Sequence, residues 1–213
     1  MSSREFRDRL TARAARADVA LTSAELGHLA AYYQLLIHWN RRINLTALAL
    51  EPASDHSLDR LFVEPLAAAA YVTHSPLIWF DLGSGGGSPA IPLRIMRPNA
   101  QLTLVESRAK KAAFLRELVR ELRLTGTTVL NERVEELART PASTGIAELV
   151  TVRALKVEER LFATAHRVLA RQGRLFIFGS RSPTPSTDSP FAHRETFRLL
   201  PGSGSNLTIC TAA

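Results

Sequence analysis

Short apolar runs alternate along the chain with longer segments of helical periodicity, which predicts an α/β fold. Residues 77–80 (Leu-Ile-Trp-Phe) are apolar without a break, as in a strand that is buried on both faces of a sheet. Similar patterns predict further strands at residues 101–106, 127–130, 148–152, 174–178, 195–200 and 206–211. Five strand–helix units that end in a hairpin favour a seven-stranded, mostly parallel sheet flanked by helices.

Apolar residues spaced three and four apart predict the helices. These are expected at residues 4–17, 23–39, 57–70, 89–96, 108–122, 133–137 and 158–170. Thr22 and Glu25 have the spacing of a capping box, which fixes the start of the second helix. Gln172-Gly173 is expected to close the last helix.

Two further expectations concern organisation. Residues 1–70 are expected to form a helical cap, and residues 71–213 the sheet domain of the same globule. The cap has an arginine-rich first helix, which faces either solvent or RNA. The segment 179–190 is rich in Ser, Pro and Thr and predicts a mobile loop.

A glycine-rich loop, Asp81-Leu-Gly-Ser-Gly-Gly-Gly-Ser88, follows the first strand and precedes a predicted helix. Glycine permits positive φ angles and close approach of a ligand to the backbone, and a helix N-terminus offers free N–H groups. The loop therefore predicts a nucleotide-like ligand. Gly85, Gly87 and Ala90 fit the dinucleotide pattern G-x-G-x-x-A. Asp81 instead resembles the acidic residue of the Asp/Glu-x-Gly-x-Gly first motif of S-adenosylmethionine (SAM) methyltransferases, so it favours SAM over NAD.

An acidic residue ends the second predicted strand at Glu106, 23 residues after Gly83. Nucleoside-binding α/β folds place there the carboxylate that accepts both ribose hydroxyls. The terminal hairpin matches the sheet of a Rossmann-like SAM methyltransferase better than that of an NAD domain. Loop, carboxylate and hairpin together predict SAM as the cofactor.

The charge balance points to a polyanionic partner. The 213 residues include 27 Lys and Arg against 20 Asp and Glu, a net charge of +7, and the sequence pI is about 10.4. Most of the cations are arginines, whose planar guanidinium suits phosphate. Such a balance favours RNA, bound through its phosphates; a basic protein without such a partner is the alternative.

Other features of the composition narrow the class of protein. A single cysteine, Cys210, rules out an internal disulfide. No apolar run approaches the roughly 20 residues of a membrane span, and the first ten residues are too charged for a signal peptide. The six histidines show no metal-ligand spacing. We expect a cytoplasmic monomer without a metal.

Several segments together resemble one family, the small-subunit rRNA guanine-N7 methyltransferases (RsmG or GidB). Residues 39–46 (Trp-Asn-Arg-Arg-Ile-Asn-Leu-Thr) are similar to its W-N-x-x-x-N-L-T segment, and His56-x-x-Asp59 to its R-H-x-x-D-S element. Residues 81–93 resemble its D-V-G-T-G-x-G-L-P-G-I-P-L. Further matches follow in the same order at Arg97-Pro98, residues 104–107, Lys110-Lys111, residues 114–116, Arg133-x-Glu135 and residues 152–154. The resemblance covers about residues 20–180.

The resemblance implies a Rossmann-like enzyme that moves a methyl group from SAM to N7 of one guanine in 16S rRNA. By position, Glu106 would hold the ribose, Val134 and Glu135 would flank the adenine, and Arg153 would be the catalytic residue near the methyl group. The loop would cradle the methionine and ribose with Asp81, Gly83, Ser84, Gly85, Gly87 and Ser88. The residues expected to contact RNA are Arg41, Arg42, Asn44, His56, Lys110 and Lys111.

Guanine N7 carries an in-plane lone pair and no proton, so methyl transfer to it needs alignment rather than a general base. The sequence agrees, because Val152-Arg-Ala-Leu stands where amine methyltransferases carry an N-P-P-Y-like motif. Cytosine C5 methylation needs a cysteine nucleophile, and Cys210 lacks a Pro-Cys context. Arg153 has three candidate roles: to donate to guanine O6, to pair with a phosphate, or to pair with a neighbouring acid.

The chain departs from the family pattern at a few positions. Ser88 replaces a leucine, and Ala90 replaces a glycine. Asp55, Arg60 and Phe178 stand where the family has Arg, Ser and Lys. These departures leave other functions open: a methyltransferase of another RNA or of a small molecule, a non-catalytic SAM- or RNA-binding protein, or an NAD oxidoreductase.

Overall fold

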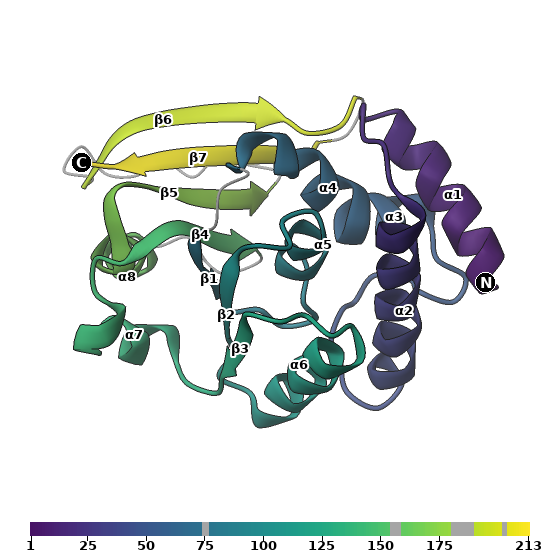
Figure 1. Ribbon diagram of the computed structural model, residues 1–213, viewed down its shortest axis with the longest axis horizontal. Coiled ribbons are helices and arrows are strands. Elements are labelled where there is room, and N and C mark those ends of the chain that lie inside the picture. Colours follow the sequence, from purple (N-terminus) through teal and green to yellow (C-terminus); the bar gives the residue numbers. More distant parts are fainter. Residues whose placement is uncertain (74–76, 154–158, 180–189, 202–203) are drawn as a thin grey trace.

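The computed structural model describes residues 1–73, 77–153, 159–179, 190–201 and 204–213. Its centre is a seven-stranded sheet in the order β3-β2-β1-β4-β5-β7-β6 (Figure 1). The first five strands in this order are parallel, and β7 runs antiparallel to both β5 and β6. The strands are β1 (Ile78–Leu82), β2 (Gln101–Val105), β3 (Thr127–Leu130), β4 (Ala147–Arg153), β5 (Leu169–Gly179), β6 (Phe191–Arg198) and β7 (Asn206–Ala212). The predicted seven-stranded, mostly parallel sheet is confirmed.

Strand β1 marks the point where the strand order reverses. It pairs with β2 on one side and with β4 on the other, with Leu82 opposite Val105 and Val152. Open α/β sheets bind ligands beyond the carboxyl ends of the strands at such a point. The glycine-rich loop follows β1 there, Glu106 follows β2, and Arg153 ends β4.

The helices flank the sheet largely where periodicity places them. They are α1 (Ser3–Ala15), α2 (Ser23–Asn40), α3 (Asp55–Leu58), α4 (Glu64–Ala68), α5 (Ala90–Ile95), α6 (Ala109–Glu121), α7 (Val134–Leu137) and α8 (Glu159–Val168). The capping box at the start of α2 is present, with both reciprocal bonds between Thr22 and Glu25. The helix expected at residues 57–70 is interrupted: a π-helical turn (Asp59–Val63) joins α3 to α4, and a 3₁₀ turn (Ala69–Tyr71) follows.

The expected end of the last helix is wrong. Helix α8 ends at Val168, and β5 begins at once at Leu169. The register with β4 then jumps from Ala147 opposite Leu169 to Leu149 opposite Arg174. Gln172 adopts a φ of 62°, and a Cβ on Gly173 would lie 2.7 Å from the Ala147 carbonyl oxygen. Gln172-Gly173 therefore forms a bulge within a strand rather than a helix end.

The closing strands are longer than predicted, and most of the segment expected to form a mobile loop lies outside the described residues. Strand β6 starts at Phe191, four residues before the predicted start at Glu195, and β7 extends to Ala212. Of the segment 179–190, residues 180–189 lie outside the described residues.

The N-terminal helices pack on one side of the molecule, where α2 lies next to α6 (Figure 1). Phe6 of α1 stacks on Tyr33 of α2 with ring centroids 4.4 Å apart, and it meets Phe62 edge-on at 5.1 Å. These rings belong to a hydrophobic cluster that continues into Trp79 of β1 and Leu102 of β2. The cap and one face of the sheet thus share a core.

The basic residues of α1 divide between internal and exposed positions. Arg13 donates from two nitrogens to the Asp59 carboxylate, both at 2.6 Å, and Arg9 binds Asp55 at 2.5 Å. Arg7 and Arg16 are exposed. Part of the arginine-rich pattern therefore anchors α1 to α3 and the turn after it.

Candidate functional site

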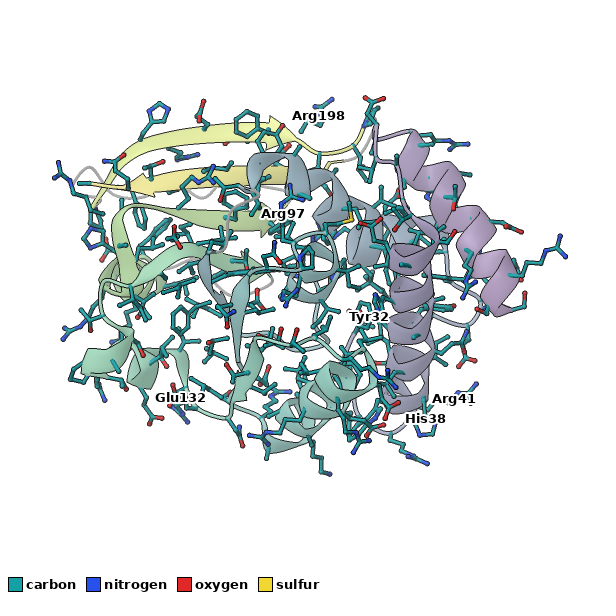
Figure 2. The ribbon with its side chains drawn as sticks, in the orientation of Figure 1. Tyr32, His38, Arg41, Arg97, Glu132 and Arg198 are labelled. Carbon is teal, nitrogen blue, oxygen red and sulfur yellow. The ribbon has the colours of Figure 1, made fainter. Side chains whose placement is uncertain are left out.

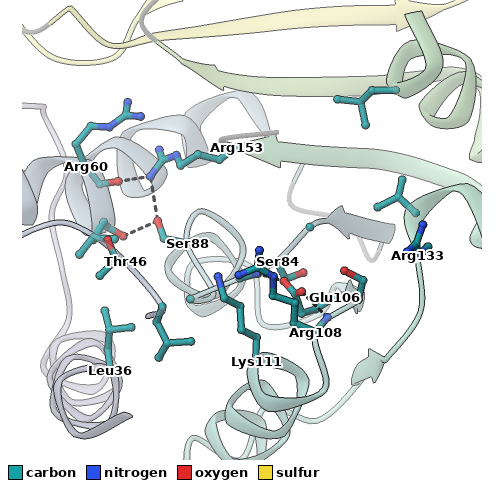
Figure 3. Close-up of a pocket in the computed structure, with 18 of the residues that line it drawn as sticks. Leu36, Thr46, Arg60, Ser84, Ser88, Glu106, Arg108, Lys111, Arg133 and Arg153 are labelled. Atoms are coloured by element: carbon teal, nitrogen blue, oxygen red, sulfur yellow. Dashed lines mark hydrogen bonds between the residues drawn. The ribbon is translucent and has the colours of Figure 1, made fainter. Parts of the chain in front are cut away.

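The pocket at the carboxyl ends of β1, β2 and β4 has a volume of about 860 Å³. It is lined by the glycine-rich loop, by the loops after β2 and β3, by α8, and by residues of the cap (Figure 3). The cap contributes Leu36, Leu45, Thr46 and Leu48 on one side and Arg60 and Leu61 on another. Sheet and cap thus both contribute to the site.

The conformation of the glycine-rich loop explains its composition. Gly83, Gly85 and Gly87 have φ angles of 74°, 51° and 90°, which side chains rarely tolerate. The backbone N–H groups of Gly83 and Ser84 donate to the Val105 carbonyl at 2.9 and 3.0 Å, which fixes the loop over the end of β2. Tyr32 lies on α2 (Figure 2), and its hydroxyl donates to the Gly86 carbonyl at 2.7 Å.

Asp81 supports the loop from behind and is buried, with 1% of its surface exposed. Its carboxylate accepts a hydrogen bond from the Thr151 hydroxyl, and its carbonyl accepts one from the Ser84 hydroxyl. Burial raises the pKa of Asp81 to about 6, against the opposing effect of these hydroxyls. Gly87 is also buried, where a Cβ would lie 3.0 Å from Cγ1 of Ile91.

Glu106 presents a fixed carboxylate to the pocket. Its Oε2 accepts the Gly85 N–H at 2.9 Å, and its Oε1 accepts the Arg108 N–H at 2.8 Å. A carboxylate oxygen has more than one lone pair, so each oxygen keeps acceptor capacity for a hydroxyl group. Val134 and Glu135 at the start of α7 line the pocket beside it. This combination suits a nucleoside whose two ribose hydroxyls bind Glu106, and SAM contains such a nucleoside.

Arg153 lies on another side of the pocket, near Arg60 and Ser88 (Figure 3). Its Nη1 donates to the Arg60 carbonyl and, at 3.0 Å, to the Ser88 hydroxyl. Its Nη2 lies 2.9 Å from Oε2 of Glu64, and its guanidinium carbon lies 4.8 Å from the centre of the Phe178 ring. Burial lowers the pKa of Arg153 to about 10, and the charge of Glu64 opposes this shift. Of the three candidate roles, pairing with a neighbouring acid is the interaction present here.

Most of the predicted cofactor residues converge on the pocket. Those that line it are Gly83, Ser84, Gly85, Ser88, Glu106, Val134, Glu135 and Arg153. Asp81 and Gly87 are buried behind the loop. Reasoning from the sequence missed Gly86, Arg133 and Thr164, which also line the pocket. Gly86 lies within the glycine run and Arg133 lies next to Val134, so the neighbouring residues could have indicated that both line the pocket.

The predicted RNA contacts do not gather in one place. Lys111 lines the pocket, and Lys110 is its exposed neighbour on α6. Arg41 instead binds the Glu51 carboxylate at 2.5 and 2.8 Å, and Arg42 lies 2.9 Å from a ring nitrogen of His38. Figure 2 shows Arg41 and His38 together at the end of α2. Asn44 and His56 are exposed, outside the pocket lining.

A different set of cations surrounds the pocket. Among its described lining residues the cations are Arg60, Arg108, Lys111, Arg133, Arg153 and Arg160, and the acids are Glu106 and Glu135. Arg108, Arg133 and Arg160 are exposed. A cleft with such an excess of positive charge attracts anionic ligands.

Two features are absent from the described residues. No cluster of three or more His, Cys, Asp and Glu residues there is arranged to hold a metal ion. No helix within the described part of the chain has the length and apolar character that a membrane crossing requires.

Comparison with known proteins gives a consistent result. A family model, GidB, described as rRNA small subunit methyltransferase G, matches residues 25–186. Relatives named ribosomal RNA small subunit methyltransferase G occur in Chloroflexus aggregans, Pseudomonas entomophila and Lactiplantibacillus plantarum, with identities of 38%, 39% and 38%. The alignments cover 88%, 61% and 65% of this chain and 76%, 59% and 55% of the relatives. Two of the three thus span less than two thirds of the relative's length.

Solved structures share the fold at low sequence identity. A precorrin-6y C5,15-methyltransferase from Geobacter metallireducens has a TM-score of 0.51 and 15% identity, over 71% of this chain and 87% of that one. A predicted O-methyltransferase from Agrobacterium tumefaciens has a TM-score of 0.52 and 18% identity, over 70% and 80%. A mutant of MtNAS in complex with S-adenosylmethionine has a TM-score of 0.59 and 14% identity, over 97% and 89%. The Rossmann-like architecture of SAM methyltransferases is therefore confirmed for this chain.

Proposed function

This chain belongs to the rRNA small subunit methyltransferase G family, and from that premise we propose that it transfers a methyl group from SAM to N7 of a guanine in 16S rRNA. The observation that carries the proposal is the fixed Glu106 carboxylate beside the glycine-rich loop, in a pocket whose described lining also includes six Lys and Arg residues. Glu106 suits the nucleoside of SAM, and the cations suit the phosphates of RNA.

The cofactor half of the pocket is formed by the ends of β1, β2 and β3. Glu106 would accept the ribose hydroxyls, and the backbone of Gly83 and Gly85 would pass close to the ligand where no Cβ intervenes. Val134 would contact the adenine ring, with Glu135 at its edge. When bound, SAM supplies a methyl group on a positively charged sulfur.

The residues of the pocket suit a nucleophile that carries no proton. Guanine N7 needs no general base, and the described lining contains no histidine or cysteine. Arg153, at the end of β4, is the residue that we place next to the target nucleotide. Its contribution is alignment of the guanine, through a guanidinium that Ser88 and Glu64 hold in place.

The RNA would approach across the exposed cations at the edge of the pocket. Arg108, Lys111, Arg133 and Arg160 can contact phosphates and would make binding dependent on salt concentration. We propose that the protein acts as a monomer.

A transfer assay with labelled SAM tests the proposal. Small ribosomal subunits from a strain that lacks the modification should accept the label in their 16S rRNA, and large subunits should not. The Gly83→Asp variant should be inactive, because Gly83 has a φ of 74° and lines the pocket. Binding of SAM by calorimetry without transfer to 16S rRNA would contradict the assigned substrate.

One alternative has structural support. Arg60, Ser88 and Phe178, three positions at which the chain departs from the family pattern, all contact Arg153. These three departures thus lie together at the end of the pocket that we assign to the substrate. If the label enters another RNA, these contacts would be the place to seek the changed specificity.

A further inference from the structure

A buried ion cluster lies behind the substrate end of the pocket. Glu64 begins α4 and is 1% exposed, and it is not among the residues that line the pocket. Its Oε2 accepts from Nη2 of Arg153 at 2.9 Å and from Nη1 of Arg60 at 3.0 Å. Both arginines do line the pocket. Glu64 therefore links two pocket cations from outside the pocket.

The cluster contains more positive than negative charge. Two guanidinium groups share one carboxylate oxygen, and the side chains of Arg153 and Arg60 are 9% and 22% exposed. Among the described residues, Oε1 of Glu64 and Nε of Arg153 are buried without a hydrogen-bond partner. Burying such groups is costly, and well-packed apolar residues often serve stability equally well. Stability alone therefore gives little reason for an ion cluster, as opposed to an apolar one, at this place.

Each arginine keeps a second, neutral anchor. Arg153 donates to the Ser88 hydroxyl at 3.0 Å, and Arg60 donates to the Ser205 hydroxyl at 3.1 Å. Loss of the Glu64 charge would leave these bonds in place but remove the group that both guanidinium planes share. The orientation of the arginines should therefore change more than the fold.

We propose that Glu64 is a positioning residue, which holds the Arg153 and Arg60 guanidinium groups at the substrate end of the pocket without itself entering it. The kinetic part of this inference rests on the proposed methyl transfer, whereas the geometric part does not. The two parts can therefore be tested separately.

The kinetic test compares Glu64→Gln with Glu51→Gln, which removes an exposed carboxylate paired with Arg41 away from Arg153. Misplacement of an aligning group typically costs about 10²-fold in rate. We expect Glu64→Gln to lower kcat of methyl transfer to small subunits by about 10- to 100-fold. Its Kd for SAM should stay within about twofold of the wild-type value. Glu51→Gln should match the wild type in both. A wild-type rate for Glu64→Gln overturns the proposal.

A double-mutant cycle shows whether Glu64 acts through Arg153. In single-turnover reactions, Glu64→Gln should have little further effect once Arg153→Gln is present. Independent, multiplicative losses would overturn the proposal. So would parallel losses of SAM binding, thermal stability and transfer in Glu64→Gln, because these would mark a purely structural residue.

The geometric test needs no substrate. In protein labelled with ¹⁵N-arginine, the Nε–H signals of Arg153 and Arg60 should shift and broaden in Glu64→Gln and remain unchanged in Glu51→Gln. Unchanged signals in Glu64→Gln would overturn the positioning proposal, whether or not the wild type methylates RNA. Failure of the wild type to methylate RNA would contradict the proposed function and leave this geometric test unaffected.

If Glu64→Gln does not fold, Glu64→Asp replaces it in both tests. The shorter acid keeps the charge but reaches the two guanidinium groups less well. Positioning predicts reduced transfer with normal SAM affinity, whereas full activity of Glu64→Asp would overturn the proposal.

Discussion

Replacing Glu106 with glutamine tests the assignment of the cofactor site. Both oxygens of Glu106 already accept a backbone N–H, from Gly85 at 2.9 Å and from Arg108 at 2.8 Å. A glutamine has only one acceptor oxygen, so its NH₂ group must face one of these two donors. Glu106→Gln therefore disturbs the loop as well as removing the charge.

The expected loss of affinity follows from the hydrogen bonds involved. A hydrogen bond to a charged group contributes about 1.5–3 kcal/mol and a neutral one about 1 kcal/mol. For two ribose hydroxyls the difference is about 1–4 kcal/mol, which weakens SAM binding by about 5- to 900-fold. The backbone donor left without an acceptor should also lower the free energy of unfolding by about 1 kcal/mol, or a few degrees in Tm.

Calorimetric titration with SAM measures this loss directly, and thermal unfolding of the same samples measures stability. The matched control is Glu136→Gln, an exposed acid of α7 that does not line the pocket. It should bind SAM like the wild type. A Kd for Glu106→Gln within threefold of wild type would refute the assignment of Glu106 to the ribose.

Three further predictions concern the supports of the site. Burial raises the pKa of Asp81 from 3.8 to about 6, so the free energy of unfolding should fall by about 3 kcal/mol as pH rises through this interval and the buried carboxyl group ionises. Urea unfolding from pH 4 to 7 should show this fall in the wild type relative to Asp81→Asn, and parallel curves for the two proteins would exclude it. Gly87→Ala should lower the free energy of unfolding by about 2 kcal/mol, because Gly87 has a φ of 90° and a Cβ there would lie close to Cγ1 of Ile91. Gly27 on α2 has open space around it, so Gly27→Ala should raise the free energy of unfolding by about 0.5–1 kcal/mol in the same urea assay. Arg13→Ala should lower the free energy of unfolding by about 1–3 kcal/mol through the lost bonds to Asp59, but Arg4→Ala, whose side chain is 94% exposed, should leave Tm unchanged.

Local patterns were sufficient to predict the glycine-rich loop and the carboxylate that line one side of the pocket. A buried strand, a run of glycines and an acid at the end of the next strand are close in sequence, and each has a conformational reason. The positive φ angles of Gly83, Gly85 and Gly87 and the position of Glu106 after β2 agree with that prediction. The sheet followed from the same short-range signals.

Long-range pairs could not be predicted in this way. Glu64 occupies an ordinary position in a predicted helix, and its contact with Arg153 joins residues 89 apart in sequence. Arg41 belongs to a family-like motif, yet its guanidinium binds Glu51. The bulge at Gln172-Gly173 depends on pairing with β4, so the turn-like dipeptide was misread as a helix end. In each case a residue or strand distant in the sequence, rather than the local sequence, determines the contact or the backbone conformation.

Identification of the methylated nucleoside tests the central claim most directly. Small subunits from a strain without the modification are incubated with SAM and the protein, and their 16S rRNA is digested and analysed by mass spectrometry. We expect 7-methylguanosine at close to one residue per subunit with wild type and none with Gly83→Asp. A different methylated nucleoside, or no methylation by a protein that binds SAM normally, would contradict it.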